Sequence, residues 1–150
     1  MNFFKRKYRK GVFIVVYKID KDEIKYFIEK RKLHWKGFEF PKGGVEKGEK
    51  LNEAAIRETT EETGLKIIEM KNHKLKGKYF YSKELKDRKG IIGKTWTLFS
   101  ARVKPGRVKL DNHEHSGYLW LNYEKALGKL TYENQKECLK KVNEWIKKNK

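Results

Sequence analysis

Residues 11–17 read GVFIVVY, and this short apolar run predicts a β-strand that is buried in the molecule. The polar turn at residues 20–23 separates it from IKYFIEK at residues 24–30, so we expect the two segments to pair as a hairpin. β-branched and aromatic residues, which favour strands, recur further along the chain. Additional strands are therefore expected at the start of GFEFPKGG and at residues 76–82, 94–103 and 118–121.

Two segments have the composition of helices. Residues 51–63 contain no glycine or proline, and Gly64 follows at the position where glycine commonly ends a helix. Residues 131–148 predict a second helix, because four side chains fall on one face: Tyr132, Leu139, Val142 and Ile146. Strands interspersed with helices indicate a mixed sheet with helices packed on it, of α/β or α+β class. With 150 residues, the chain is expected to form one domain.

Lysine and arginine outnumber aspartate and glutamate by 38 to 20, which gives the chain a formal net charge of +18. Such a charge attracts polyanions, whether nucleic acid, nucleotides, inositol phosphates or an anionic membrane. A second interpretation is favoured, because lysine is spread over the whole chain and a lysine-rich composition can reflect a hot habitat or genome bias. Charge alone therefore leaves binding of RNA through a basic surface undecided.

Other features of the sequence indicate where in the cell the protein is expected to be found. No apolar run approaches the roughly 18 residues that cross a bilayer, so we expect no membrane association. The N-terminal segment lacks the small-residue cleavage pattern of a signal peptide. Cys138 is the single cysteine, which excludes an internal disulfide and makes the reducing cytoplasm the expected location. We further expect a monomer or a weak dimer.

The helix predicted at residues 51–63 carries closely spaced carboxylates. At about 100° per residue, Glu58 and Glu62 lie one turn apart on the same face, and Glu61 lies at its border. Like charges at this spacing destabilise a helix unless a cation neutralises them. Mg²⁺ takes oxygen ligands and binds through a few carboxylates together with substrate phosphates, so the pattern predicts a metal site. The alternative is a solvated helix whose glutamates pair with Arg57.

A longer pattern surrounds these carboxylates. Its fixed positions are Gly43, Glu49, Arg57, Glu58, Glu61, Glu62, Gly64 and Leu65. The spacing resembles the signature of the Nudix hydrolases, G-x5-E-x7-R-E-U-x-E-E-x-G-U, with Thr59 where a bulky aliphatic residue is usual. The resemblance implies an α/β/α sandwich with a mixed β-sheet between helices, formed as a single Nudix hydrolase domain over residues 1–150. It also implies metal-dependent hydrolysis of a nucleoside diphosphate linked to another group.

The matched positions carry roles that the resemblance implies. Glu58 and Glu62 would be the principal metal ligands, with Mg²⁺ as the cofactor and Mn²⁺ as a substitute. Glu61 would be a further ligand or a base that orients water, and Gly43 would contribute its backbone carbonyl to the metal. Cations at such a site neutralise a pyrophosphate, hold it in line and lower the pKa of the attacking water.

The two other charged residues of the signature, Arg57 and Glu49, are counted with the catalytic residues. We expect them to act indirectly. They would brace the loop before the helix against the helix itself rather than touch substrate.

Three segments narrow the expected substrate. They are FPKGGVEKGE at residues 40–49, EHSGYLWL at residues 114–121 and LTYENQKECL at residues 130–139. Together they resemble the asymmetric diadenosine tetraphosphate hydrolases of the Nudix family. On this interpretation Glu114 enters the metal site from a loop, as a ligand or as the general base. The alternative is that Glu114 and the next residue simply begin a strand.

Five residues are candidates for contacts with a nucleoside polyphosphate substrate. Lys42 and Lys94 suit a polyphosphate as point charges. His34, Tyr79 and Tyr81 suit an adenine, because stacking of a base on aromatic side chains is worth about 1–3 kcal/mol. The alternative for each aromatic side chain is a place in the core.

Two other functions remain open at this stage. A phosphohydrolase acting on the 5′ end of RNA would use the same signature, and the net charge of +18 would suit its substrate. A Nudix-fold module that binds RNA or protein without catalysis is the second alternative. Three clustered carboxylates disfavour that module, because they repel a polyanionic ligand unless metal is bound. Inositol pyrophosphates also remain open as substrates.

Overall fold

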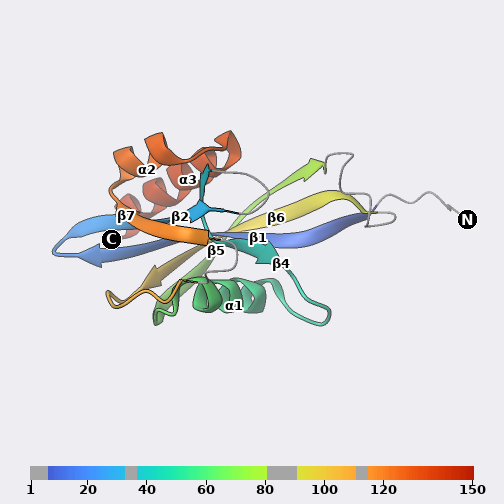
Figure 1. Cartoon of the computed structure of the whole chain (residues 1–150), viewed down its shortest axis with the longest axis horizontal. Coiled ribbons are helices and arrows are strands. Elements are labelled where there is room, and N and C mark those ends of the chain that lie inside the picture. The colour runs from blue at the N-terminus through green and yellow to red at the C-terminus, as the bar shows by residue number, and fades with distance from the viewer. Residues whose placement is uncertain (1–6, 33–36, 81–90, 111–114) are drawn as a thin grey trace, which may run out of the picture.

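The computed structural model describes residues 7–32, 37–80, 91–110 and 115–150, and within them a seven-stranded sheet lies between helices (Figure 1). The strands are β1 (Lys7–Asp20), β2 (Glu23–Arg31), β3 (Gly37–Glu39), β4 (Lys42–Gly44), β5 (Ile67–Phe80), β6 (Ile91–Val103) and β7 (His115–Leu121). The helices are α1 (Leu51–Thr63), α2 (Tyr123–Lys129) and α3 (Glu133–Asn149). Strand order is β3-β2-β1-β6-β5, with β4 also paired to β1 and β7 to β2. Because β1 and β6 run parallel while the other pairs are antiparallel, the sheet is mixed, as predicted.

Helices cover both faces of this sheet. In Figure 1, α1 lies on one face and α2 and α3 lie on the other. Buried side chains accordingly form two clusters, one containing Ala54 and Ala55 of α1 and the other containing Leu139, Val142 and Ile146 of α3. The predicted α/β/α sandwich is confirmed. No described helix has the length and apolar composition needed to cross a bilayer.

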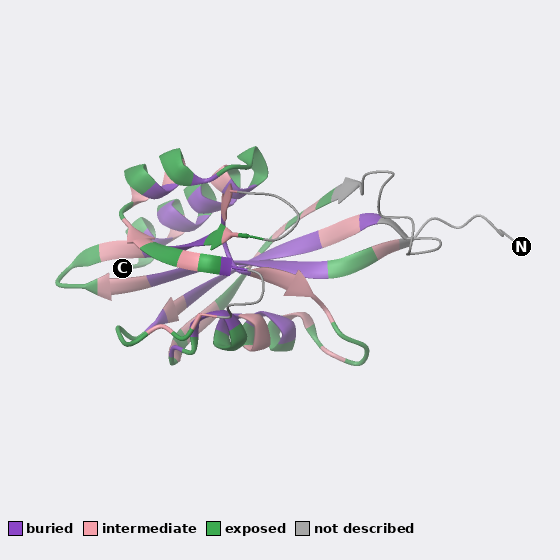
Figure 2. Cartoon of the chain, in the orientation of Figure 1, coloured by how far each residue is buried: buried purple, intermediate pink, exposed green. Residues whose placement is uncertain are grey.

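The apolar run in β1 shows why both faces are covered. Its side chains alternate between the two clusters, with Val12, Ile14 and Val16 on the α1 side and Phe13, Val15 and Tyr17 on the α3 side. Each of these residues is at most 3% exposed. A strand buried on both faces carries a continuous apolar sequence instead of an alternating one. The buried colour of the central strands in Figure 2 shows the same arrangement.

The helix predicted at residues 51–63 is confirmed as α1, with both ends held by hydrogen bonds. Gly64 has a φ of 67°, a left-handed conformation that glycine adopts without strain, and its N–H donates to the Thr60 oxygen at 2.9 Å. At the other end the side chain of Glu53 accepts a hydrogen bond from the N–H of Lys50 at 3.0 Å. These hydrogen bonds fix where α1 begins and ends.

The C-terminal region differs from its prediction in one respect. α3 begins at Glu133, and Tyr132 precedes it with 44% of its surface exposed. Tyr132 therefore does not belong to the buried face, and its assignment to that face was wrong. The other three predicted positions on the face are buried.

Three further elements were not predicted. One is β4, because Lys42–Gly44 was expected to be a loop after a single short strand. α2 is short, and its start is marked by Asn122, whose side chain accepts a hydrogen bond from the N–H of Lys125 at 2.9 Å. The first half of β5 was also missed. Its pairing with β6 shifts register between Asn72 and Lys76, so the side chains of this polar stretch do not follow a regular alternation.

Candidate active site

α1 turns two of its three signature glutamates toward the sheet. The side chain of Glu58 is 13% exposed and Glu62 is 5% exposed, whereas the side chain of Glu61 is 55% exposed. Ala54 and Ala55 are fully buried on the same helix. Glu58 and Glu62 thus lie on the inner side of α1 with small residues, as the helical spacing predicted, and Glu61 lies at its solvent edge.

Gly43 brings the backbone of β4 against the Glu58 carboxylate. The pairing of Gly43 with Val12 of β1 holds this backbone beside α1. A Cβ atom on Gly43 would collide with the carboxyl group of Glu58. The absence of a side chain at this position therefore makes room for one of the predicted metal ligands.

Arg57 ties the loop before α1 to the helix. Its Nε and Nη2 donate to the two carboxylate oxygens of Glu49 at 2.8 and 3.0 Å, and Nη2 also donates to the Gly44 oxygen at 2.8 Å. Nη1 donates to Glu58 at 2.8 Å and to Glu61 at 3.4 Å. These are the contacts of a brace between loop and helix, and they also fix the side chain of Glu58.

The pKa values of these carboxylates move in opposite directions. The hydrogen bond from Arg57 lowers the pKa of Glu49 to about 2, so this carboxylate stays charged. Burial raises the pKa of Glu58, an effect that Arg57 partly offsets. Burial also raises the pKa of Glu62 well above its ordinary value, and the neighbouring carboxylate of Glu29 raises it further. Charging Glu62 in this environment costs free energy unless a cation compensates it.

Glu58 and Glu62 together fit a divalent cation. Oε2 of Glu62 is buried and has no hydrogen-bond partner among the described residues. A hard cation prefers carboxylate oxygens and would neutralise both groups at once. These two carboxylates, with the Gly43 backbone beside them, stay the predicted ligands of a metal.

A second group of buried charges adjoins Glu62 and was missed in the sequence. Nε2 of His115 lies 3.1 Å from Oε2 of Glu29 and 2.8 Å from Oε2 of Glu39. Ligand atoms of these three residues all lie within 4.8 Å of one another, a spacing that a metal ion could bridge. Glu39 is already neutralised, however, by Arg31 at 3.0 Å and Lys42 at 3.5 Å. The described part of the site thus contains two groups of carboxylates that could face a metal, and the assignment of the metal to Glu58 and Glu62 stays a prediction.

The charge around Glu39 is balanced within the protein. Burial acts to raise its pKa, but the hydrogen bond with His115 and the charges of Lys42 and Arg31 together hold the pKa below its ordinary value. Glu29 instead faces Glu62, whose pKa its charge raises. The group thus links His115 to a predicted metal ligand through Glu29.

The sequence contained a signal for this group. Glu29 stands inside the strand IKYFIEK, and Glu39 stands between Phe38 and Phe40, so each is a carboxylate at a position where an apolar residue is usual. The two lie on paired strands, with Glu29 opposite Glu39. Both carboxylates contact His115 because β7 pairs with β2 in one particular register, and the sequence did not indicate that register.

The structure shows the surroundings of some of the residues that were predicted to contact substrate. Lys42 contacts Glu39, and the charge of Lys94 acts on Glu58, lowering its pKa. Tyr79 is opposite Lys94 in the pairing of β5 with β6, which brings two candidates side by side along the backbone. The side chain of Tyr79, and His34, Tyr81 and Glu114 as a whole, lie outside the described residues, so their roles stay predictions.

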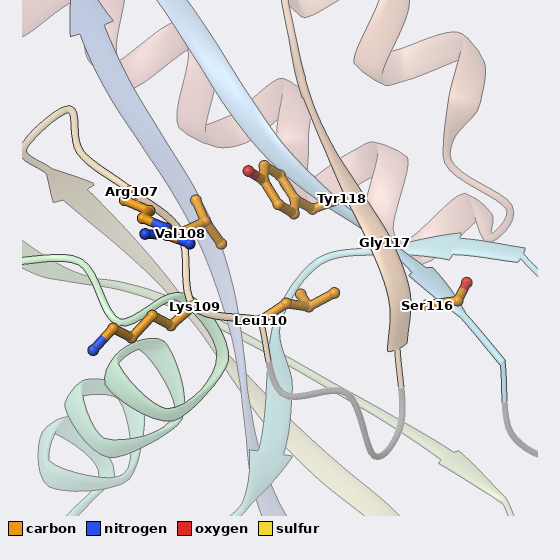
Figure 3. Close-up of a pocket in the computed structure, with 7 residues that line it drawn as sticks. All are labelled: Arg107, Val108, Lys109, Leu110, Ser116, Gly117 and Tyr118. Atoms are coloured by element: carbon orange, nitrogen blue, oxygen red, sulfur yellow. The ribbon is translucent and has the colours of Figure 1, made fainter.

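A depression of about 730 Å³ lies beside this site, between β7 and residues 107–110 (Figure 3). Figure 3 shows side chains of both segments bordering it, including Arg107, Lys109 and Tyr118. Tyr118 is opposite Glu29 in the pairing of β7 with β2 and stacks on Phe27, with ring centroids 5.5 Å apart. Two cations and an aromatic ring therefore border a hollow next to the buried carboxylates.

Comparisons with known proteins identify the family of this chain. The family described as NUDIX domain matches residues 7–142, and the chain therefore belongs to the Nudix family. It is a Nudix pyrophosphohydrolase, as the resemblance to the Nudix signature predicted.

Individual relatives carry two different activities in their names. An RNA pyrophosphohydrolase of a Nitratiruptor species is 29% identical over 96% of both chains. An asymmetrical bis(5′-nucleosyl)-tetraphosphatase of Mus musculus is 31% identical over 75% of this chain and 72% of its own length. The crystal structure of a C. elegans Ap4A hydrolase binary complex has a TM-score of 0.73 and 26% identity, covering 92% of this chain and 97% of that one. The predicted resemblance to the asymmetric tetraphosphatases is confirmed.

Proposed function

We propose that the chain hydrolyses diadenosine tetraphosphate to ATP and AMP, with Mg²⁺ as its cofactor. The observation that carries the proposal is the placement of Glu58 and Glu62 on the buried side of α1, against a backbone that has no side chain at Gly43. The similarity to the mouse tetraphosphatase and to the C. elegans hydrolase supports the choice of substrate. We place the protein in the cytoplasm as a monomer or weak dimer.

Each group of the site has a part in this reaction. Glu58 and Glu62 would hold the metal, and Arg57 keeps the Glu58 carboxylate in place through its 2.8 Å hydrogen bond. Bound Mg²⁺ would neutralise the polyphosphate and lower the pKa of the attacking water. Glu61, at the solvent edge of α1, would contribute a further ligand or orient that water.

Cationic residues would orient the polyphosphate. Lys94 lies near enough to Glu58 for its charge to act on that carboxylate, so it can contact phosphates held there. Lys42 is held through Glu39, which fixes its position on β4. Orienting the chain of phosphates in this way determines which phosphorus meets the water.

Hydrolysis at the 5′ end of RNA is the second candidate. The RNA pyrophosphohydrolase of the Nitratiruptor species matches this chain over 96% of its length, a larger share than the mouse tetraphosphatase does. The net charge of +18 also suits a nucleic-acid substrate. A direct comparison of the two substrates is therefore the most informative experiment.

We expect diadenosine tetraphosphate to give ATP and AMP, and its KM to rise only mildly with salt because it makes few phosphate contacts. RNA contacts many more phosphates, so its binding should fall with a log–log salt slope of about −0.7 per neutralised phosphate. The measurement is kcat/KM for the dinucleotide and for 5′-triphosphorylated RNA, at low and at near-physiological salt, with products separated by chromatography. Better turnover of RNA at both salt concentrations, or formation of two ADP, would replace the first proposal with the second.

Replacement of Glu114 by glutamine tests the proposed loop ligand or base. If Glu114 acts around the activated water, E114Q should lower kcat by more than it raises KM. Kinetics of the variant and the wild type would be compared from pH 6 to 9 at saturating metal. Identical kinetic constants across that range would leave Glu114 as the residue that merely precedes β7.

A further inference from the structure

A second basic depression lies away from the signature, between β5 and the C-terminal half of α3. It has a volume of about 340 Å³ and lies on the face of the sheet opposite α1, where α3 packs (Figure 1). We call it the α3 lysine site and define it by Lys71, His73, Lys74, Lys141, Trp145 and Lys148. Neither the signature nor the proposed reaction accounts for it.

Positive charge at this site is not balanced by the protein. The four lysines are exposed, and none of them forms an ion pair with another residue in the described part of the chain. Glu144 is the single acidic residue among those lining the depression. The site therefore combines four cations with one carboxylate, and its potential is positive.

The backbone of β5 is irregular at the segment that carries Lys71 and Lys74. The register shift between Asn72 and Lys76 interrupts the ladder with β6, and Lys74 has a φ of 55°. The side chain of Asn72 accepts a hydrogen bond from the N–H of Lys74 at 2.8 Å and so holds this left-handed turn. A non-glycine residue in that conformation is uncommon, and the described residues adopt it elsewhere in the β1–β2 turn, at Lys21 and Asp22.

Aromatic side chains form the inner part of the site. The ring of His73 lies edge-on to Trp145, with centroids 5.3 Å apart, and its Nε2 is 2.7 Å from Oγ of Ser100. Burial lowers the pKa of His73 to about 4, and the charges of Lys71 and Lys141 add to the shift. The imidazole is therefore neutral at physiological pH and responds to the surrounding positive charge.

We infer that the α3 lysine site binds the phosphate backbone of single-stranded nucleic acid, with Trp145 next to a base. Lysines from two elements converge on one hollow, as they do in grooves that follow a phosphate chain. The partly buried indole of Trp145, with Nζ of Lys71 and of Lys150 at 5.8 and 5.6 Å from its ring centroid, adds an aromatic edge beside the lysines that a site for inorganic phosphate would not need. The inference is independent of which pyrophosphate the active site hydrolyses.

The test measures binding separately from turnover. The probe is a fluorescently labelled, 5′-hydroxyl single-stranded RNA, which lacks the terminal pyrophosphate, and binding is followed by anisotropy over a range of salt. The site variant combines K71Q, K141Q and K148Q. The control variant combines K21Q, K66Q and K125Q, which remove the same charge from other exposed positions. Thermal unfolding would establish that both variants are folded.

We expect the site variant to raise Kd at least tenfold at low salt and to make the log–log salt slope shallower by about 2, since each phosphate contact on a single strand contributes about 0.7. The control variant should change Kd by less than about threefold, and turnover of the dinucleotide should be unchanged in both. Equal losses in the two variants would overturn the inference, because the binding would then reflect net charge alone. A raised KM for the dinucleotide in the site variant would also overturn it, by assigning these lysines to the active site.

Two further measurements address the kind of ligand. RNA binding should raise the pKa of His73 in a titration followed by NMR, and W145F should weaken RNA binding about fivefold or more. Inorganic polyphosphate supplies phosphates without bases. If it binds as tightly as RNA of equal charge and W145F affects neither ligand, the assignment to nucleic acid is wrong.

Discussion

Replacing Glu58 or Glu62 with glutamine is expected to lower kcat by at least about a hundredfold, which corresponds to about 2.7 kcal/mol of transition-state stabilisation. Glutamine keeps the shape of each side chain but removes the negative charge that a divalent cation requires. Both positions lie on the inner side of α1, where the side chain of Glu58 is 13% exposed and Glu62 is 5% exposed. The measurement is kcat at saturating Mg²⁺, with circular dichroism to establish that the variants are folded.

The control for this experiment is E53Q, which changes an exposed glutamate of the same helix. Glutamine at position 53 can still accept the hydrogen bond from the Lys50 N–H, so the start of α1 is kept. Its turnover should match that of the wild type within about twofold. Near-normal turnover of E58Q or E62Q at saturating metal would rule out the metal site proposed here.

The second large effect is expected for R57M. Methionine has a similar length but cannot donate the hydrogen bonds that join Arg57 to Glu49, to the Gly44 oxygen and to Glu58. The loop before α1 and the Glu58 carboxylate should both move, and a displacement of about 1 Å at a reacting group can cost about a hundredfold in rate. We expect kcat to fall between tenfold and a hundredfold, with a lower melting temperature.

K125M serves as the matched control, because Lys125 is exposed on α2 and far from the signature in the chain. It should change neither kcat nor the melting temperature. The brace would be shown to be dispensable if R57M retained full turnover. A fall in kcat at an unchanged melting temperature would instead mean that Arg57 acts on the reaction directly, against its proposed role.

Much of the sandwich could be predicted because its signals are local. The apolar run in β1, the helix at Leu51–Thr63 and the glycine that ends it are each visible within about one element of the sequence. The same holds for the arrangement of Glu58, Glu62 and Arg57, since helical spacing fixes their relative positions. The family resemblance then supplied the sandwich that these elements form.

The missed parts depend on contacts between distant segments. Glu29, Glu39 and His115 meet only when β7 is paired with β2, and no short-range pattern encodes that register. The first half of β5 escaped prediction because a register shift interrupts its alternation. Tyr132 was misplaced for a different reason: an apolar side chain one residue before a helix fits the helical period without belonging to the helix.

The buried carboxylates beside α1 lower the stability of the fold. Glu29, Glu39 and Glu62 occupy interior positions that apolar side chains would fill at lower free energy. The fold tolerates them because the rest of the sandwich supplies a large apolar core on both faces of the sheet. Under the proposed function, a metal held by Glu62 gives a reason why this chain keeps carboxylates that selection for stability alone would have replaced.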